Sequence, residues 1–216
     1  LEFRRVLFRS SSDMQALELN HITLDYGRRR VIHDVSLRVS HGQVLVVTGR
    51  NGSGKSSLLR VICGLQPASM GHIWLHAADT RHAPLAMRHA IGWMAPDLML
   101  YRELTGHENL RFFADVRGLD MPDDAIDALL ADVGLAGRGT DLVATYSSGM
   151  THRLRYAYAL LHQPALLLLD EPSVMLDQSG HDLLERVVAR QRQRGITVIA
   201  TNDPRETRFA DITLSL

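Results

Sequence analysis

A glycine-rich loop between an apolar run and an amphipathic segment constrains this chain more than any other feature of its sequence. Residues 49–56, which read GRNGSGKS, follow the apolar run 44–47 and precede the apolar positions of residues 58–65. A loop with this spacing, placed between a buried strand and a helix, is typical of phosphate binding, because backbone N–H groups and the helix N-terminus surround an anion. The alternative interpretation is an ordinary glycine-rich loop.

The residue types of this loop predict separate roles. Glycines let the backbone turn inward around a phosphate, and the ammonium of Lys55 supplies a positive point charge. The hydroxyl of Ser56 would ligate Mg²⁺. The predicted phosphate-binding residues of this segment are Gly49, Arg50, Asn51, Gly52, Ser53, Gly54, Lys55, Ser56 and Ser57.

Two carboxylates follow a second apolar run. Asp170 and Glu171 come directly after residues 166–169, and ligands of open parallel sheets bind beyond the carboxyl ends of the strands. In phosphoryl-transfer sites one acid holds Mg²⁺ and a neighbouring acid orients and deprotonates the attacking water. We assign Asp170 to the metal and Glu171 to the water. Taken alone, the pair reads as the solvated end of a strand; the loop at 49–56 favours catalysis.

Short apolar runs alternate with helical periods along the chain, which predicts an α/β fold with a mostly parallel sheet. Residues 44–47, 166–169 and 197–200 are continuously apolar, as expected for strands covered on both faces. Residues 17–24 and 35–39 instead alternate between apolar and polar, which indicates half-buried antiparallel strands.

The organisation predicted from these patterns is one P-loop NTPase domain over residues 14–216. Residues 84–161 read mainly as helices, with a capping box from Thr105 to Glu108, and predict a helical subdomain inserted between core segments 14–83 and 162–216. Residues 1–13 continue no pattern and are predicted to be an unstructured tail or an artefact.

Charge and cysteine content exclude several classes of protein. The 24 basic and 24 acidic side chains cancel, so no bulk positive field attracts nucleic acid, and we expect none as a partner. The single cysteine, Cys63, excludes an internal disulfide and a cysteine-rich zinc site, which fits a reducing cytoplasm. No apolar run approaches the roughly 20 residues of a membrane-spanning helix.

The ordered set of motifs resembles that of the ATP-binding cassette (ABC) family, over residues 17–214. Between the loop and the carboxylates, residues 146–150 read YSSGM, which is similar to the family signature LSGGQ. The resemblance implies ATP and Mg²⁺ as ligands, ATP hydrolysis, and a head-to-tail dimer whose signature residues reach the γ-phosphate bound by the other subunit. Those residues are Ser147, Ser148 and Gly149. Without the other motifs, the serines read as simple helix caps.

Four further positions are interpreted through this resemblance. Tyr26 is similar to the aromatic residue that stacks on adenine, although a Tyr-Gly pair alone reads as a turn, and Asp177 is similar to the end of the loop that connects the two sites. Pro96 stands where the family has a glutamine, and Asn202 stands where it has a histidine that contacts the γ-phosphate. Asparagine still donates a hydrogen bond, so we keep Asn202 as a catalytic residue without a titrating group. Asp97 either replaces the glutamine through water or is solvated.

The function implied by the resemblance is that of the nucleotide-binding subunit of an ABC transporter. Residues 95–110 are similar to single-cassette export subunits, which implies export through a separate transmembrane permease, a second nucleotide-binding subunit, and a place on the inner face of the cell membrane. The alternatives are a soluble ABC ATPase outside transport, and a catalytically weak subunit of an ATP-gated assembly. Residues 84–118 would dock the permease or else belong to the core.

Overall fold

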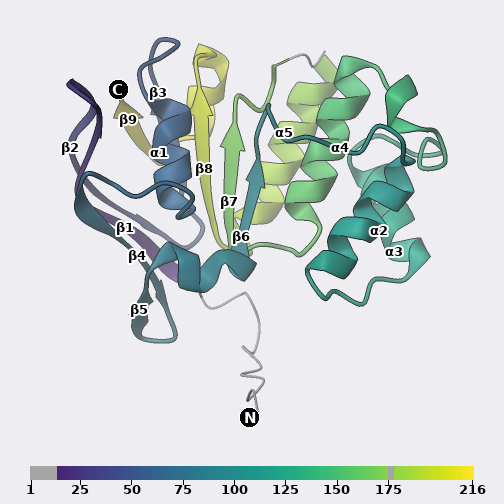
Figure 1. Ribbon diagram of the computed structural model, residues 1–216, viewed down its shortest axis with the longest axis horizontal. Coiled ribbons are helices and arrows are strands. Elements are labelled where there is room, and N and C mark those ends of the chain that lie inside the picture. The colour runs from purple at the N-terminus through teal and green to yellow at the C-terminus, as the bar shows by residue number, and fades with distance from the viewer. Residues whose placement is uncertain (1–13, 175–177) are drawn as a thin grey trace.

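The computed structural model describes residues 14–174 and 178–216, so the predicted tail lies outside the described residues (Figure 1). An antiparallel sheet in the order β2-β1-β4-β5 packs beside a parallel sheet in the order β6-β7-β8-β3-β9. The strands of the antiparallel sheet are β1 (Met14–Tyr26), β2 (Arg29–Ser40), β4 (Met70–Ala77) and β5 (Thr80–His82). The strands of the parallel sheet are β3 (Val44–Thr48), β6 (Ile91–Met94), β7 (Leu166–Asp170), β8 (Ile196–Thr201) and β9 (Ile212–Ser215).

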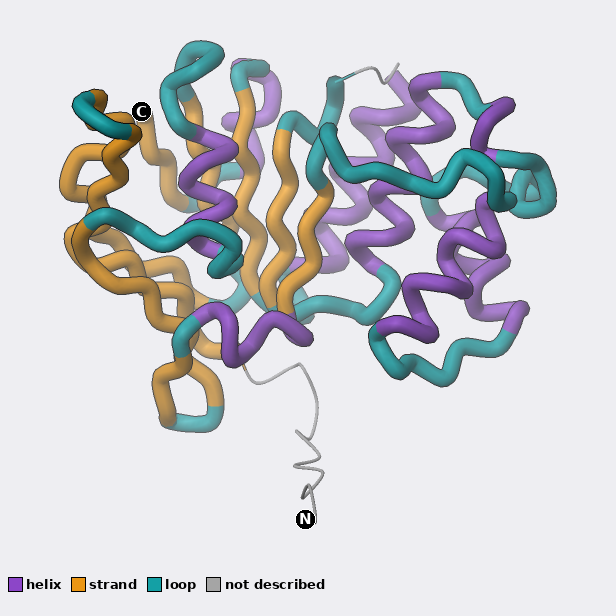
Figure 2. The backbone as a smooth tube through the Cα atoms, viewed as in Figure 1, coloured by secondary structure: helices purple, strands orange, loops and turns teal. Residues whose placement is uncertain are grey.

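Helices flank the parallel sheet and form most of the end of the molecule remote from the antiparallel sheet (Figure 2). The α-helices are α1 (Lys55–Ile62), α2 (Gly106–Val116), α3 (Asp123–Asp132), α4 (Ser148–Leu160) and α5 (Gln178–Gln191). Short 3₁₀ helices are η2 (Pro84–Ala90), η3 (Val143–Thr145) and η4 (Pro204–Phe209). Among the residues that the structure describes, no helix is both long and apolar enough to cross a membrane.

The parallel sheet, the antiparallel sheet and the helices around them confirm the predicted α/β fold.

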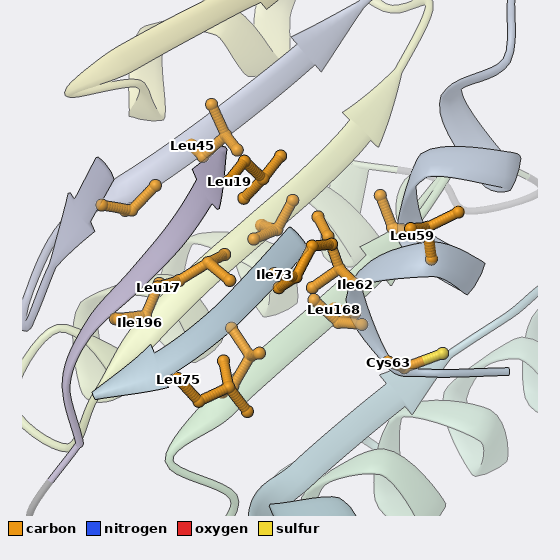
Figure 3. Close-up of a cluster of buried hydrophobic side chains, with 14 of the residues drawn as sticks. Leu17, Leu19, Leu45, Leu59, Ile62, Cys63, Ile73, Leu75, Leu168 and Ile196 are labelled. Atoms are coloured by element: carbon orange, nitrogen blue, oxygen red, sulfur yellow. The ribbon is translucent and has the colours of Figure 1, made fainter. Parts of the chain in front are cut away.

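The continuous apolar runs form the centre of the parallel sheet, because both of its faces are covered. Every residue of β7 and β8 is buried. Alternate residues of a strand point to opposite faces. Leu168 therefore packs with Leu45, α1 and the antiparallel sheet in one core (Figure 3). Leu167 and Leu169 pack with α4 and α5 in the other core.

Strand register brings the predicted site residues to one edge of this sheet. Thr48 of β3 is opposite Thr201 of β8, and Asp170 of β7 is opposite Ala200. The residues that follow these three strands, which include Gly49, Glu171 and Asn202, therefore leave the sheet at the same edge.

One short part of the segment 84–161, which was predicted to be mainly helical, is a strand. Residues 91–94 form β6, which pairs with β7 in the parallel sheet. The helices that follow begin with α2, whose capping box is as predicted: Glu108 N–H donates to Thr105 Oγ1 at 3.1 Å, and Thr105 N–H donates to Glu108 Oε2 at 2.8 Å.

Candidate functional site

The loop between β3 and α1 needs glycine at its two ends for steric reasons. Gly49 has φ of 152°, and a Cβ there would lie 2.5 Å from Ser53 Oγ and 2.7 Å from the carbonyl oxygen of Leu216. Gly54, the N-cap of α1, has φ of 109°, and a Cβ there would lie 2.4 Å from Val31 Cγ1. The backbone of the loop therefore packs closer to its neighbours than any residue with a side chain allows.

Lys55 closes this loop and reaches the end of β7. Its side chain is 5% exposed, and Nζ donates to the carbonyl oxygens of Gly49 at 2.9 Å and Arg50 at 3.4 Å. The same nitrogen lies 3.3 Å from Oε1 of Glu171. A buried ammonium surrounded by oxygen atoms fits an anion-binding role, because its charge is screened little by water.

Ser56 and Asp170 form a pair of hard oxygen donors. Ser56 Oγ donates to Asp170 Oδ1 at 3.0 Å, and Asp170 is 2% exposed. Burial raises the pKa of Asp170, and the nearby charge of Glu171 raises it further, whereas the hydrogen bond from Ser56 and the charge of Lys55 lower it. A hydroxyl and a carboxylate side by side suit Mg²⁺, which prefers oxygen ligands and keeps part of its water shell.

Glu171 and Asn202 are joined to each other and to the phosphate loop. The backbone N–H of Asn202 donates to Glu171 Oε2 at 3.3 Å, and Asn202 Nδ2 donates to Asn51 Oδ1 at 3.0 Å. Glu171 N–H donates to the carbonyl oxygen of Ala200 at 2.8 Å, which fixes β7 to β8 at this edge. The predicted base, the predicted γ-phosphate contact and the loop therefore lie in one hydrogen-bonded group.

An open cleft of about 500 Å³ runs from this group to Tyr26. Tyr26 is 47% exposed, and its hydroxyl lies 3.2 Å from Ser57 Oγ and donates to Gln66 Oε1 at 2.9 Å. The hydrogen bond with Ser57 is the main cause that lowers the pKa of Tyr26. Residues that line the cleft are Tyr26, Arg29, Val31, Asn51, Gly52, Gly54, Lys55, Ser56, Ser57 and Glu171.

The signature segment lies apart from this cleft. Ser147 caps α4, since its Oγ accepts from the backbone N–H of Met150 at 3.2 Å, and Ser148 and Gly149 form the first turn. Of the described residues that line the cleft, none belongs to 147–149. The structure thus provides the predicted helix cap, while a phosphate contact from this segment requires another molecule. Asp177 lies outside the described residues.

Pro96, which stands where the ABC family has a glutamine, lies in an exposed turn after β6. Pro96 and Asp97 are both exposed, and Asp97 Oδ2 pairs with Arg60 Nη2 at 3.2 Å. The negative charge of Asp97 contributes to the raised pKa of Asp170, although less than burial does. Asp97 is therefore solvated and paired with Arg60, and a substitute role through water stays a prediction.

Sequence reasoning missed Arg29 and Val31, which line the cleft, and Gln66, which accepts the hydrogen bond from Tyr26. Arg29 and Val31 come from β2, which turns back beside Tyr26 after the turn at Gly27. The hairpin pattern contained this information, because a tight turn at Gly27 places the start of the second strand beside the end of the first. Gln66 lies beyond α1 and had no signal in the sequence.

Comparisons with known proteins agree with this geometry. Residues 32–174 match the family model described as ABC transporter. The chain is 33% identical to the cytochrome c biogenesis ATP-binding export protein CcmA of Vibrio cholerae, over 90% of the chain and 93% of that protein. It is 32% identical to the linearmycin resistance ATP-binding protein LnrL of Bacillus subtilis, over 86% of the chain but only 60% of LnrL.

The fold also matches a solved structure, a putative ABC transporter ATP-binding protein from Pyrococcus furiosus, with a TM-score of 0.82, 22% identity, and 93% and 97% of the two chains covered. At this identity the likeness concerns the fold alone. The family match and the identity to CcmA along nearly its whole length carry the assignment. The chain belongs to the ABC transporter family, as one of its ATP-binding domains.

Proposed function

We propose that the chain binds ATP with Mg²⁺ and hydrolyses it as the nucleotide-binding subunit of an ABC transporter. One contact carries this proposal. Lys55 of the phosphate loop lies beside Glu171 at the end of β7, with 3.3 Å between Nζ and Oε1. This contact supports the proposal because a cation that would bind phosphate and a carboxylate that would act as base need to lie close together. The family to which the chain belongs supports the same activity.

Different residues of the cleft would bind the phosphates, the adenine and the metal ion. Backbone N–H groups of residues 49–56 and the ammonium of Lys55 would hold the phosphates, and Tyr26 would support the adenine at the other end of the cleft. Ser56 and Asp170 would hold Mg²⁺, which when bound neutralises charge on the phosphate oxygens.

Glu171 would orient the attacking water and accept its proton. The N–H of Asn202 on Oε2 limits the rotation of this carboxylate, and the Asn202 amide is within reach of the loop through Asn51. Asparagine does not titrate, so the pH dependence of hydrolysis would not include a histidine at this position.

A second nucleotide-binding subunit would complete the site. Ser147, Ser148 and Gly149 lie away from the cleft of their own chain, at the N-terminus of α4, where free N–H groups favour an anion. Contact with the nucleotide of another subunit would use these groups. The dimer partner is either a second copy of this chain or a related chain.

The membrane subunit would dock on a cleft of about 620 Å³ between the end of α1, β6 and α4. Two large apolar side chains that line this cleft, Met99 and Leu65, are 87% and 67% exposed, and exposed apolar side chains that lie together mark interaction sites. Arg88 and Arg117 also line the cleft, so a short amphipathic helix with an acidic side chain is the occupant that fits. This contact would hold the chain at the cytoplasmic face of the membrane.

Export is the direction we propose for transport. The protein that the chain matches over 93% of its length is named an ATP-binding export protein, and LnrL is named a resistance protein. Import proteins are also among the relatives, such as the aliphatic sulfonates import ATP-binding protein SsuB of Pectobacterium atrosepticum, of which the chain covers 69%.

Co-purification tests the proposed docking. A multi-span membrane protein, identified by mass spectrometry, should co-purify with the parent and be lost on Arg88→Glu and Arg117→Glu substitution.

Steady-state hydrolysis by the purified chain tests the enzymatic proposal. Glu171→Gln keeps the shape of the side chain but removes the base, so we expect MgATP binding to persist and turnover to fall by about 100-fold or more. Hydrolysis by Glu171→Gln at the parental rate would contradict the assignment. An inactive parent that remains inactive with its membrane partner would instead favour the catalytically weak assembly subunit.

A further inference from the structure

Two side chains of α4 donate to a single carbonyl oxygen, that of Pro172, the residue after Glu171. His152 Nε2 lies 2.9 Å from this oxygen, and the hydroxyl of Tyr156 lies 3.0 Å from it. The two residues are four positions apart and so lie on one face of the helix. They are 3% and 0% exposed, and their rings meet edge to face with centroids 5.8 Å apart. Both lone pairs of the carbonyl are therefore used.

Both donors are held in the protonation state that this arrangement requires. Burial lowers the pKa of His152, which keeps the imidazole neutral, and the Pro172 carbonyl selects the tautomer with hydrogen on Nε2. Burial, followed by the charge of Glu206, raises the pKa of Tyr156 well above its ordinary value, so the phenol remains a donor.

The segment so held carries backbone strain at Glu171. This residue has φ of 50°, in the left-handed region, which is strained for a residue with a side chain. Such a conformation persists only where the surroundings fix it. The backbone N–H of Glu171 is fixed by Ala200, and the peptide that follows has no second N–H to offer, because residue 172 is proline. The carbonyl of Glu171 accepts from the N–H of Val174 at 3.2 Å, within the same turn, and the carbonyl of Pro172 is the group through which another element, α4, holds this turn.

We propose that His152 and Tyr156 are positioning residues, which orient the carboxylate of Glu171 through the Pro172 carbonyl and tie it to the helix that begins with the signature segment. This inference rests on the proposed function, in which Glu171 is the base. The link lies within one subunit: α4 begins with Ser148, and its second turn, at His152, contacts the segment that follows Glu171. A displacement of α4 on engaging a partner's nucleotide would thus be transmitted to the base.

A matched control exists at the opposite end of β7. Gln191 of α5 is 3% exposed and donates from Nε2 to the carbonyl oxygen of Pro164 at 2.9 Å, just before the strand. Tyr156→Phe and Gln191→Met each remove one buried hydrogen bond to a proline carbonyl beside the same strand. Only Tyr156→Phe removes it at the end that carries Glu171.

Hydrolysis and MgATP binding of these variants test the inference. One hydrogen bond contributes about 0.5–1.5 kcal/mol, so we expect kcat to fall about three- to tenfold in Tyr156→Phe and in His152→Met, with the Kd for MgATP unchanged. His152→Gln keeps a donor and should retain more activity than His152→Met. Gln191→Met should lower the melting temperature to a similar extent and leave kcat unchanged.

A double-mutant cycle separates positioning from general damage. If His152 and Tyr156 act through Glu171, then Tyr156→Phe has no further effect on the residual single-turnover rate of Glu171→Gln. An undiminished effect in that background, an equal loss of kcat in Gln191→Met, or parental kcat in both Tyr156→Phe and His152→Met would overturn the inference. Parental hydrolysis by Glu171→Gln alone would instead contradict the proposed function on which it rests.

Discussion

The ammonium nitrogen of Lys55 lies 3.3 Å from Oε1 of Glu171, at the edge where β3 and β7 both end. Both side chains are mostly buried, with 5% and 19% exposed, so their interaction is screened less than that of a surface pair. The pair joins the phosphate loop to the carboxylates at the end of β7, although the two residues are 116 positions apart in the sequence. The structure therefore brings the lysine that we propose binds phosphate and the carboxylate that we propose acts as base into direct contact.

Removal of the Ser56 hydroxyl should weaken metal-dependent binding specifically. Ser56 Oγ bonds to the buried Asp170 and, in our account, ligates Mg²⁺ beside it. We expect Ser56→Ala to raise the Kd for ATP by at least about tenfold with Mg²⁺ present, in line with the effect of disturbing metal sites. Titrations in EDTA, where no metal contributes, should give the same Kd for variant and parent. Equal weakening in both buffers would show that Ser56 contacts the nucleotide and not the metal.

A methyl group at Gly54 should destabilise the fold more than one at Gly118. Both glycines have positive φ, but a Cβ at Gly54 would lie 2.4 Å from Val31 Cγ1, whereas nothing lies within 4 Å of one at Gly118. We expect Gly118→Ala to lower the free energy of unfolding by about 1 kcal/mol and Gly54→Ala by about 3 kcal/mol, since overpacking adds to the backbone strain. Urea denaturation measures both. Equal losses would mean that β2 moves aside at little cost.

His162 should make the protein less stable in mild acid. Burial, followed by the charge of Arg117, lowers the pKa of His162 to about 4 from 6.5, and its Nε2 lies 3.0 Å from the carbonyl oxygen of Ile91. Between these pKa values the unfolded chain binds a proton that the folded chain does not, so stability is full above pH 6.5 and falls as the pH falls toward 4.

The magnitude follows from the same linkage. His162 alone should lower the free energy of unfolding by about 2 kcal/mol between pH 7 and pH 5. Glutamine can keep the hydrogen bond to Ile91 but does not titrate. The free energy of unfolding of His162→Gln should therefore fall by about 2 kcal/mol less than that of the parent between pH 7 and pH 5. Urea unfolding of both proteins at the two pH values checks this, and identical pH dependence would show that His162 is protonated in the folded state.

The central strands and the two motifs could be predicted from the sequence, because each depends on neighbouring residues. The run 166–169 is apolar throughout since β7 is covered on both faces, and Asp170 and Glu171 follow it directly. The register of β7 and β8, which brings Asn202 to Glu171, then follows from the parallel sheet.

Other parts of the site depend on contacts that leave no local pattern. The strand β6 has only four residues, of which one is glycine, and so it shows no periodicity against the helices around it. The shared contact of His152 and Tyr156 with Pro172 depends on how α4 packs against the end of β7. Packing of this kind is determined by the whole core.

Calorimetric titration of the purified chain with ATP, with and without Mg²⁺, measures whether the phosphate loop binds the nucleotide. We expect magnesium-dependent binding at one site per chain. We expect Lys55→Ala to abolish this binding while the protein stays folded, because the buried ammonium between the loop and Glu171 is lost. If the parent shows no magnesium-dependent binding, or if Lys55→Ala binds with parental affinity, the phosphate loop does not have the proposed role.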